Sequence, residues 1–228
     1  MPSVRRLLLL VLLVAAGALA YRHLPPEWDP AAPLDLRAAP GLLTGFKLRR
    51  LAADPPACFA AFAASGLAPA RVPDRPSDAG CAVEDAVLLP SSLRVAPRPP
   101  AVTCRVAAAW TLWERHALQP AARRHLGTEV AGVRHLGSYS CRNVNHAAIG
   151  RRSQHATANA IDVAGFTLAD GREVRLARDW GGTGPETAFL RAVRDGACRW
   201  FHGVLGPDHD AAHADHFHLD MGPWRACR

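Results

Sequence analysis

The order of apolar and polar residues divides the chain into three parts. Leu7–Ala20 is an unbroken apolar run of 14 residues, and it follows two arginines, Arg5 and Arg6. Residues 21–45 are rich in proline and show no sustained period, which is typical of a linker. Helical and strand spacings recur from there to the end. We therefore expect one folded domain over residues 46–228.

The longest helical pattern covers Val102–His125. Apolar residues recur there three or four positions apart, and Gly127 follows as a stop signal. We expect Pro120 to kink this helix, because proline lacks the amide that the helix needs. Two tryptophans on its apolar side, Trp110 and Trp113, are expected to pack in the core.

After this helix the pattern changes to short apolar runs that alternate with period two. These runs predict strands at Glu129–Leu136, Ala158–Phe166, Glu173–Leu176, Trp200–Leu205 and Phe217–Met221. Ala169–Gly171 has the composition of a hairpin turn. Two further helices are expected, at Pro55–Gly66 and Pro185–Cys198. The expected fold class is α+β, with a small antiparallel sheet flanked by helices.

The composition of the chain is that of a globular protein. Of its 228 residues 49% are hydrophobic and 21% are charged, which excludes a disordered or fibrous chain. The formal net charge of +7 suits an anionic partner, but it does not select one. Lys47 is the only lysine, and the excess of arginine is typical of a GC-rich genome. We therefore expect no nucleic-acid partner.

The N-terminal segment predicts export. Residues 1–20 combine arginines, an apolar run and the small-residue site Ala18–Ala20, as a signal peptide does. Because the run is shorter than the roughly 20 residues that span a bilayer, cleavage is favoured. An uncleaved anchor, with a membrane tether through residues 7–20, stays open. The expected location is periplasmic or at the outer face of the inner membrane.

Six cysteines in an exported chain predict three disulfides and a disulfide-stabilised domain. No two of them form a Cys-x-x-Cys pair, so a zinc site built from cysteines is not expected. The count allows fifteen pairings. Our working expectation joins them in sequence order: Cys58–Cys81, Cys104–Cys141 and Cys198–Cys227.

Histidines are concentrated near the C-terminus, where residues 202–218 hold five of the eleven. On a strand, His216, His218 and Asp220 share one face, while the apolar residues between them point into the core. Taken alone, this pattern fits either a solvated edge strand or a face that binds a metal.

A second polar segment, Ser153–Val163, contains His155 and Asp162. Their odd separation would put them on opposite faces of a straight strand, so we expect His155 on a bend and Asp162 in the strand. With one imidazole of the His-x-His pair they would form a three-ligand zinc site with an open position.

Three segments carry a family resemblance: Gly137–Asn143, His155–Asp162 and Ala214–Asp220. They resemble the bacterial extensin-like C-terminal domain family, from about Phe46 to the end. The two metal motifs also resemble the zinc fold group of D-Ala-D-Ala metallopeptidases, lysostaphin-type endopeptidases and the hedgehog signalling domain. The resemblance implies a sheet that carries Zn²⁺ on His155, Asp162 and His218.

The resemblance leaves the catalytic base open. The D-Ala-D-Ala peptidase branch implies Asp215, three residues before the last ligand, whereas the lysostaphin-like branch implies His216. It also implies an arginine that stabilises the oxyanion, for which Arg142 is the loosely matching candidate. His209 and His213 are weaker candidates for the cleft.

Together with the expected export, the resemblance implies a zinc-dependent peptidase that hydrolyses peptide bonds of peptidoglycan, in cross-links or in stem peptides. The alternative is a non-catalytic, zinc-stabilised domain that binds the cell wall. A third interpretation, an exported DNA-binding protein, rests on charge alone. The bond cut and the oligomeric state stay open.

Overall fold

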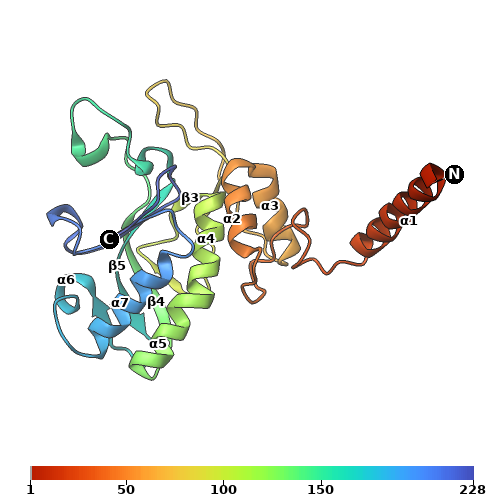
Figure 1. Ribbon diagram of the computed structural model, residues 1–228. Helices are drawn as coiled ribbons and strands as arrows, with labels where there is room; N and C mark the ends of the chain where they lie inside the picture. Colours follow the sequence, from red (N-terminus) through yellow and green to blue (C-terminus); the bar gives the residue numbers. More distant parts are fainter. Residues whose placement is uncertain (1) are drawn as a thin grey trace.

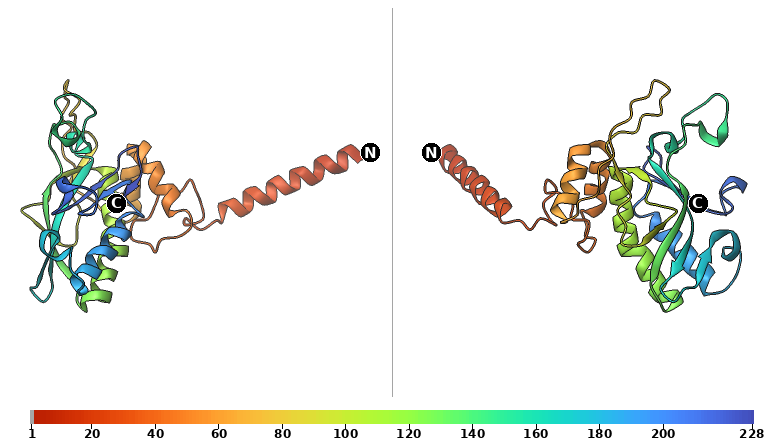
Figure 2. Two further views of the ribbon diagram at one scale, coloured as in Figure 1. Left: turned by 60° about the vertical axis from the view of Figure 1, so that its left-hand side comes forward. Right: turned by 180° about the vertical axis from the view of Figure 1, so that it is seen from behind.

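A long N-terminal helix projects away from the folded domain. The computed structural model describes residues 2–228, so Met1 of the predicted signal segment lies outside it. Helix α1 (Pro2–Arg22) extends into free space (Figures 1 and 2). Val4–Arg22 has a mean hydropathy of 2.0, and none of its most apolar window is buried, so the helix is long and apolar enough to cross a membrane. A signal sequence has the same properties, and both roles are consistent with export.

Part of the proline-rich segment belongs to the folded domain. Leu34 and Leu36 are buried in the main core, and the Leu36 amide donates a hydrogen bond of 2.7 Å to Ser65 Oγ. Nearer α1, the Lys47 ammonium donates to the carbonyl of Pro26 at 2.6 Å. Packing thus begins at about residue 34, before the expected boundary at residue 46.

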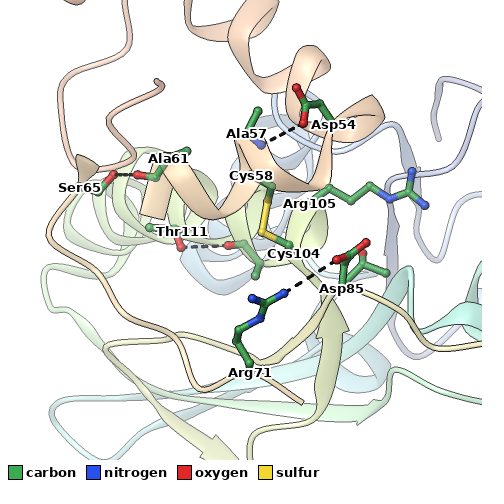
Figure 3. The surroundings of a disulfide bond; sticks show 12 residues. Asp54, Ala57, Cys58, Ala61, Ser65, Arg71, Asp85, Cys104, Arg105 and Thr111 are labelled. Carbon is green, nitrogen blue, oxygen red and sulfur yellow. Dashed lines mark hydrogen bonds and ion pairs between the residues drawn. A yellow bond between two sulfur atoms is a disulfide. The ribbon is translucent and has the colours of Figure 1, made fainter. Parts of the chain in front are cut away.

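Two short helices, α2 (Thr44–Ala53) and α3 (Pro55–Ala64), open the helical part of the domain. Asp54 caps α3 by accepting a hydrogen bond from the Ala57 amide at 3.1 Å. A disulfide from Cys58 to Cys104 joins α3 to the first residue of α4 (Figure 3).

The disulfides correct the expected pairing. They are Cys58–Cys104, Cys81–Cys141 and Cys198–Cys227, so sequence order is wrong for the first two and right for the third. Cys58 packs against the start of α4, whereas Cys81 lies beside Cys141 on an extended arm, residues 68–85. The Cα atoms of the first two pairs are 6.1 and 5.5 Å apart, within the normal disulfide range.

The expected long helix is present but contains a π-helical turn. It consists of α4 (Cys104–Trp113), the turn η1 (Glu114–Leu118) and α5 (Gln119–Leu126). The Gln119 amide reaches back five residues to the Glu114 carbonyl, a wider turn that accommodates Pro120, which has no amide to donate. Gly127 ends the helix in the left-handed region at φ 67°.

The main sheet has seven strands. Six of them follow the order β2-β4-β5-β8-β7-β9, and β6 pairs with the second half of β5. Their bounds are β2 (Arg94–Ala96), β4 (Val130–Gly137), β5 (Ala160–Leu168), β6 (Glu173–Arg175), β7 (Gly203–Leu205), β8 (Phe217–Asp220) and β9 (Ala226–Cys227). The pairs β2–β4 and β7–β9 are parallel, so the sheet is mixed rather than wholly antiparallel. The α+β class is confirmed. A separate antiparallel pair consists of β1 (Ala86–Leu88) and β3 (Ala101–Thr103).

Helices cover one face of this sheet. The ring centroid of Trp113 in α4 lies 6.3 Å from that of Phe166 in β5. The ring centroid of Phe189 in α7 (Pro185–Ala197) lies 5.4 Å from that of Phe166. Trp110 and Trp113 are completely buried, as expected. The short α6 (Leu176–Asp179) links β6 to the loop before α7 (Figure 1).

A bulge in β5 preserves the core face along the whole strand. Arg134 pairs with Gly165 and His135 with Val163, so Ala164 is the extra residue. The shift keeps the apolar residues on both sides of it facing the helices. It leaves Asp162 on the opposite face.

We predict that Leu36→Ala destabilises the domain by about 2–5 kcal/mol, the usual cost of a buried leucine cavity. The matched control is Leu42→Ala, six residues on, whose leucine is 84% exposed. Its unfolding midpoint in urea should match the wild type. Equal midpoints for all three proteins would show that residues 21–45 are a free linker.

Candidate metal centre

A short turn places His155 at the start of the central strand. The 3-10 turn η3 (Gln154–Thr157) immediately precedes β5, and the Ser153 hydroxyl accepts a hydrogen bond from the His155 amide at 3.3 Å. The His155 side chain is buried at the base of this turn. This is the bend that the spacing of His155 and Asp162 predicts.

Strand pairing places His218 beside Asp162. In the antiparallel register of β5 and β8, Asp162 and His218 are direct Cα partners. Phe217 and Leu219 are fully buried in the core. Because side chains alternate along a strand, His218 and Asp220 face the opposite side, the side that Asp162 also faces.

Three ligand atoms from these residues form a nearly equilateral triangle. His155 Nε2 lies 3.1 Å from Asp162 Oδ1 and 3.0 Å from His218 Nδ1, and the third side, from His218 Nδ1 to Asp162 Oδ1, is 3.1 Å. Zinc binds imidazole nitrogen at about 2.0–2.1 Å, so two donors of a tetrahedral site lie about 3.3 Å apart. The triangle is close to this spacing.

Hydrogen bonds on the far side of each ring fix the tautomers. His155 Nδ1 faces the carbonyl of Ser138 at 3.2 Å, and His218 Nε2 faces a carboxylate oxygen of Asp220 at 2.9 Å. Both partners accept hydrogen bonds, so these two nitrogens carry the ring protons. In these neutral tautomers, His155 Nε2 and His218 Nδ1 would be free to bind a metal together with Asp162 Oδ1. The donor set of two imidazoles and one carboxylate fits a zinc ion.

The pKa values of Asp162 and His218 are both shifted towards the charged forms of these side chains. Burial alone would raise the pKa of Asp162, but hydrogen bonds with His155 and His218 outweigh it and hold that pKa well below its ordinary value. Burial also opposes charge on His218, yet its hydrogen bonds with Asp162 and Asp220 raise its pKa to about 9. Without a metal the cluster thus favours a protonated His218, and a metal that binds there would displace this proton.

The two candidates for the catalytic base, His216 and Asp215, differ in exposure and in their distance from the cluster. His216, just before β8, is only 12% exposed, and its Nε2 is 3.7 Å from Asp162 Oδ1. Asp215 is 61% exposed, and its carboxylate accepts a hydrogen bond from His216 Nδ1 at 2.8 Å. Asp215 therefore holds the ring of His216, whose other nitrogen faces Asp162 of the candidate metal ligands.

A cavity of about 470 Å³ is lined by two members of the cluster, Asp162 and His218, and by several of the other predicted residues, while His155 is buried behind it. Arg142 lines it from the loop that contains the 3-10 turn η2 (Val144–His146). His209 and His213 line it from the loop around η4 (Ala211–His213).

A second group of possible ligand atoms borders this cavity. It consists of His209, Asp210 and His213, which are more exposed than the first cluster. Asp210 already caps η4 and accepts from His213 Nδ1 at 2.6 Å. These hydrogen bonds account for the arrangement without a metal.

Two further groups support the cluster. Strand alternation places Asp220 on the face of His218, as expected, but its role as the hydrogen-bond acceptor for His218 Nε2 is seen only in the structure. The Ser138 carbonyl is a main-chain atom brought in by β4, and no sequence signal marks it.

The largest cavity described, about 850 Å³, lies elsewhere, around Glu114 and His116. The buried Glu114 carboxylate accepts hydrogen bonds from Trp110 Nε1 at 2.8 Å and from the Ser92 amide at 2.9 Å. Because it also accepts from the Ser91 and Ser92 hydroxyls, it has a structural role.

We predict that the full-length protein binds one equivalent of zinc. His155→Ala should abolish this binding, because it removes a ligand whose position no other residue can fill. The matched control, His209→Ala, should retain one equivalent when metal content is measured by mass spectrometry. Zinc that remains after His155→Ala, or that is lost only in the control, would contradict this assignment.

The comparison with protein families confirms the resemblance to the extensin-like C-terminal domain family. Residues 56–228 match the family model described as extensin-like protein C-terminus, and this match covers every residue of the cluster. No curated protein and no solved structure matched the chain. With three quarters of its length inside that match, the chain belongs to the extensin-like C-terminal family.

Proposed function

We propose that this protein is a zinc-dependent peptidase that hydrolyses peptide bonds in peptidoglycan. The observation that carries the proposal is the convergence of three possible ligand atoms, His155 Nε2, Asp162 Oδ1 and His218 Nδ1, beside the oriented ring of His216 at an open cavity. Three protein ligands with a free position are typical of catalytic rather than structural zinc. The similarity of the motifs to D-Ala-D-Ala metallopeptidases and lysostaphin-type endopeptidases supports the same reaction.

Each residue has a distinct task in this proposal. His155, Asp162 and His218 would hold a zinc ion, which would supply Lewis acidity towards a peptide carbonyl and a water molecule. His216 accepts the proton from that water through Nε2 and passes it to the leaving amine. Asp215 keeps the proton of His216 on Nδ1, so that Nε2 can act as the base. Asp215 is therefore a positioning residue.

Arg142 is the proposed partner of the developing oxyanion. Its side chain is half-buried at the wall of the cavity, and its only side-chain hydrogen bond in the described structure is a long one, 3.5 Å, to the Asn143 carbonyl. A guanidinium with free donors can stabilise the negative charge of a tetrahedral intermediate. The proposal for this residue rests on its place in the cavity.

The substrate class follows from the proposed location. The N-terminal helix and the three disulfides are consistent with export. On the outer side of the bacterial inner membrane, the most abundant peptide-bearing polymer is peptidoglycan. We propose a location in the periplasm or at the outer face of this membrane.

One observation favours the alternative function, a zinc-stabilised domain that binds the wall without cutting it. Asp215 occupies the sequence position of the base in D-Ala-D-Ala peptidases, yet its carboxylate is largely in solvent. If that carboxylate were the required base, the site would bind zinc without hydrolysing peptides.

The test is digestion of purified peptidoglycan by the zinc-loaded full-length protein, followed by mass analysis of the released fragments. We expect His216→Ala to lower the rate by about 10²–10⁴-fold, the usual contribution of a general base. Asp215→Asn should lower it less, because the ring of His216 remains beside the cluster. Both variants should still bind one equivalent of zinc.

A larger loss in Asp215→Asn than in His216→Ala would show that the two roles are reversed. If the wild type binds zinc and sediments with peptidoglycan but releases no fragment, the wall-binding function is correct.

A further inference from the structure

The loop of residues 142–152 carries positive charge that no carboxylate of the cavity balances. Arg142, Arg151 and Arg152 all line the cavity of the metal cluster from this loop. The carboxylates that line it are Asp162, Asp210 and Asp220. In the described part of the chain their ion pairs are all with histidines. The cavity thus has an acidic, histidine-rich side and a separate basic side.

The three arginines differ in exposure and in the hydrogen bonds that their side chains form with the protein. Arg152 donates to the Ala79 carbonyl at 2.6 Å and to Asn143 Oδ1 at 3.0 Å, so it fastens the loop to a neighbouring arm. Arg142 is half-buried near the base of the loop. Arg151 is exposed, and within residues 2–228 its side chain has no hydrogen bond or ion pair to the protein.

The main chain holds Arg151 firmly while its side chain stays free. The Arg151 carbonyl accepts from the Val144 amide at 2.9 Å, and Asn143 forms a bridge with Arg152 in antiparallel register. The disulfide Cys81–Cys141 ties the base of the loop to the same arm that Arg152 contacts. Figures 1 and 2 show this loop and the arm extending from the same end of the molecule. Because the loop backbone is anchored, the entropy lost on binding is limited to that of the Arg151 side chain.

We propose that Arg151 binds a carboxylate of the substrate, so that the site selects peptides with a free carboxylate close to the scissile bond. A guanidinium matches a carboxylate through two parallel hydrogen bonds, which an amide cannot reproduce. This inference rests on the proposed peptidase function and defines its substrate more narrowly. The carboxylate has two chemical sources, the C-terminus of a stem peptide or the side chain of one of its acidic residues.

The experiment measures equilibrium binding of three synthetic probes to zinc-loaded full-length protein that carries His216→Ala to prevent turnover. The probes are acetyl-Lys-D-Ala-D-Ala with a free C-terminus, the same peptide as its C-terminal amide, and acetyl-Glu-D-Ala-D-Ala amide. Titration calorimetry gives the dissociation constants, and zinc content is measured in every sample.

We expect one of the two carboxylate probes to bind about tenfold more tightly than the Lys amide probe, as one charge-assisted contact allows. The tighter probe identifies the source of the carboxylate. Adding Arg151→Gln should remove this preference without changing zinc content or the binding of the Lys amide probe. The matched control, Arg124→Gln on α5, exchanges an exposed arginine outside the cavity and should keep the preference.

Equal binding of all three probes, or a preference that survives Arg151→Gln, would overturn the inference. Failure of every probe to bind would also overturn it. Neither result decides the proposed function, because release of fragments from peptidoglycan is measured separately with His216 intact.

Discussion

The pairing of β5 with β8 is the constraint on which the site depends. It makes Asp162 and His218 direct neighbours, and the turn before β5 adds His155. Burial of Phe217 and Leu219 in the core fixes which face of β8 the histidine occupies. A shift of one residue in this register would bury His218 and expose the core residues. The stability of the sheet therefore enforces the geometry of the cluster.

Alternation along strands explains why so much of this cluster could be predicted from the sequence. The shared face of His216, His218 and Asp220, the bend at His155 and the place of Asp162 all follow from period-two spacing. Apolar residues three or four positions apart likewise predict the long helix and its buried tryptophans. The orientation of Asp215 could not be predicted, because it depends on where β8 begins, and one residue decides whether its side chain turns inward.

Contacts between distant segments were the features that the sequence did not reveal. The pairing Cys58–Cys104 depends on how α3 packs against α4, and Cys81 meets Cys141 only because an extended arm lies beside the loop. The burial of Leu36 was hidden by the prolines around it, which resemble a linker. The parallel edge strands β2 and β9 likewise depend on long connections rather than on local pattern.

Two sets of residues that line one cavity have different roles in the proposed function. Histidines and carboxylates on the sheet would hold a metal and move protons, and arginines on a disulfide-anchored loop would hold the substrate. The most direct test of its central claim is anomalous diffraction at the zinc edge from crystals grown with zinc. The account predicts one peak at bonding distance from His155 Nε2, Asp162 Oδ1 and His218 Nδ1. A peak only at His209, Asp210 and His213, or no peak at all, would contradict it.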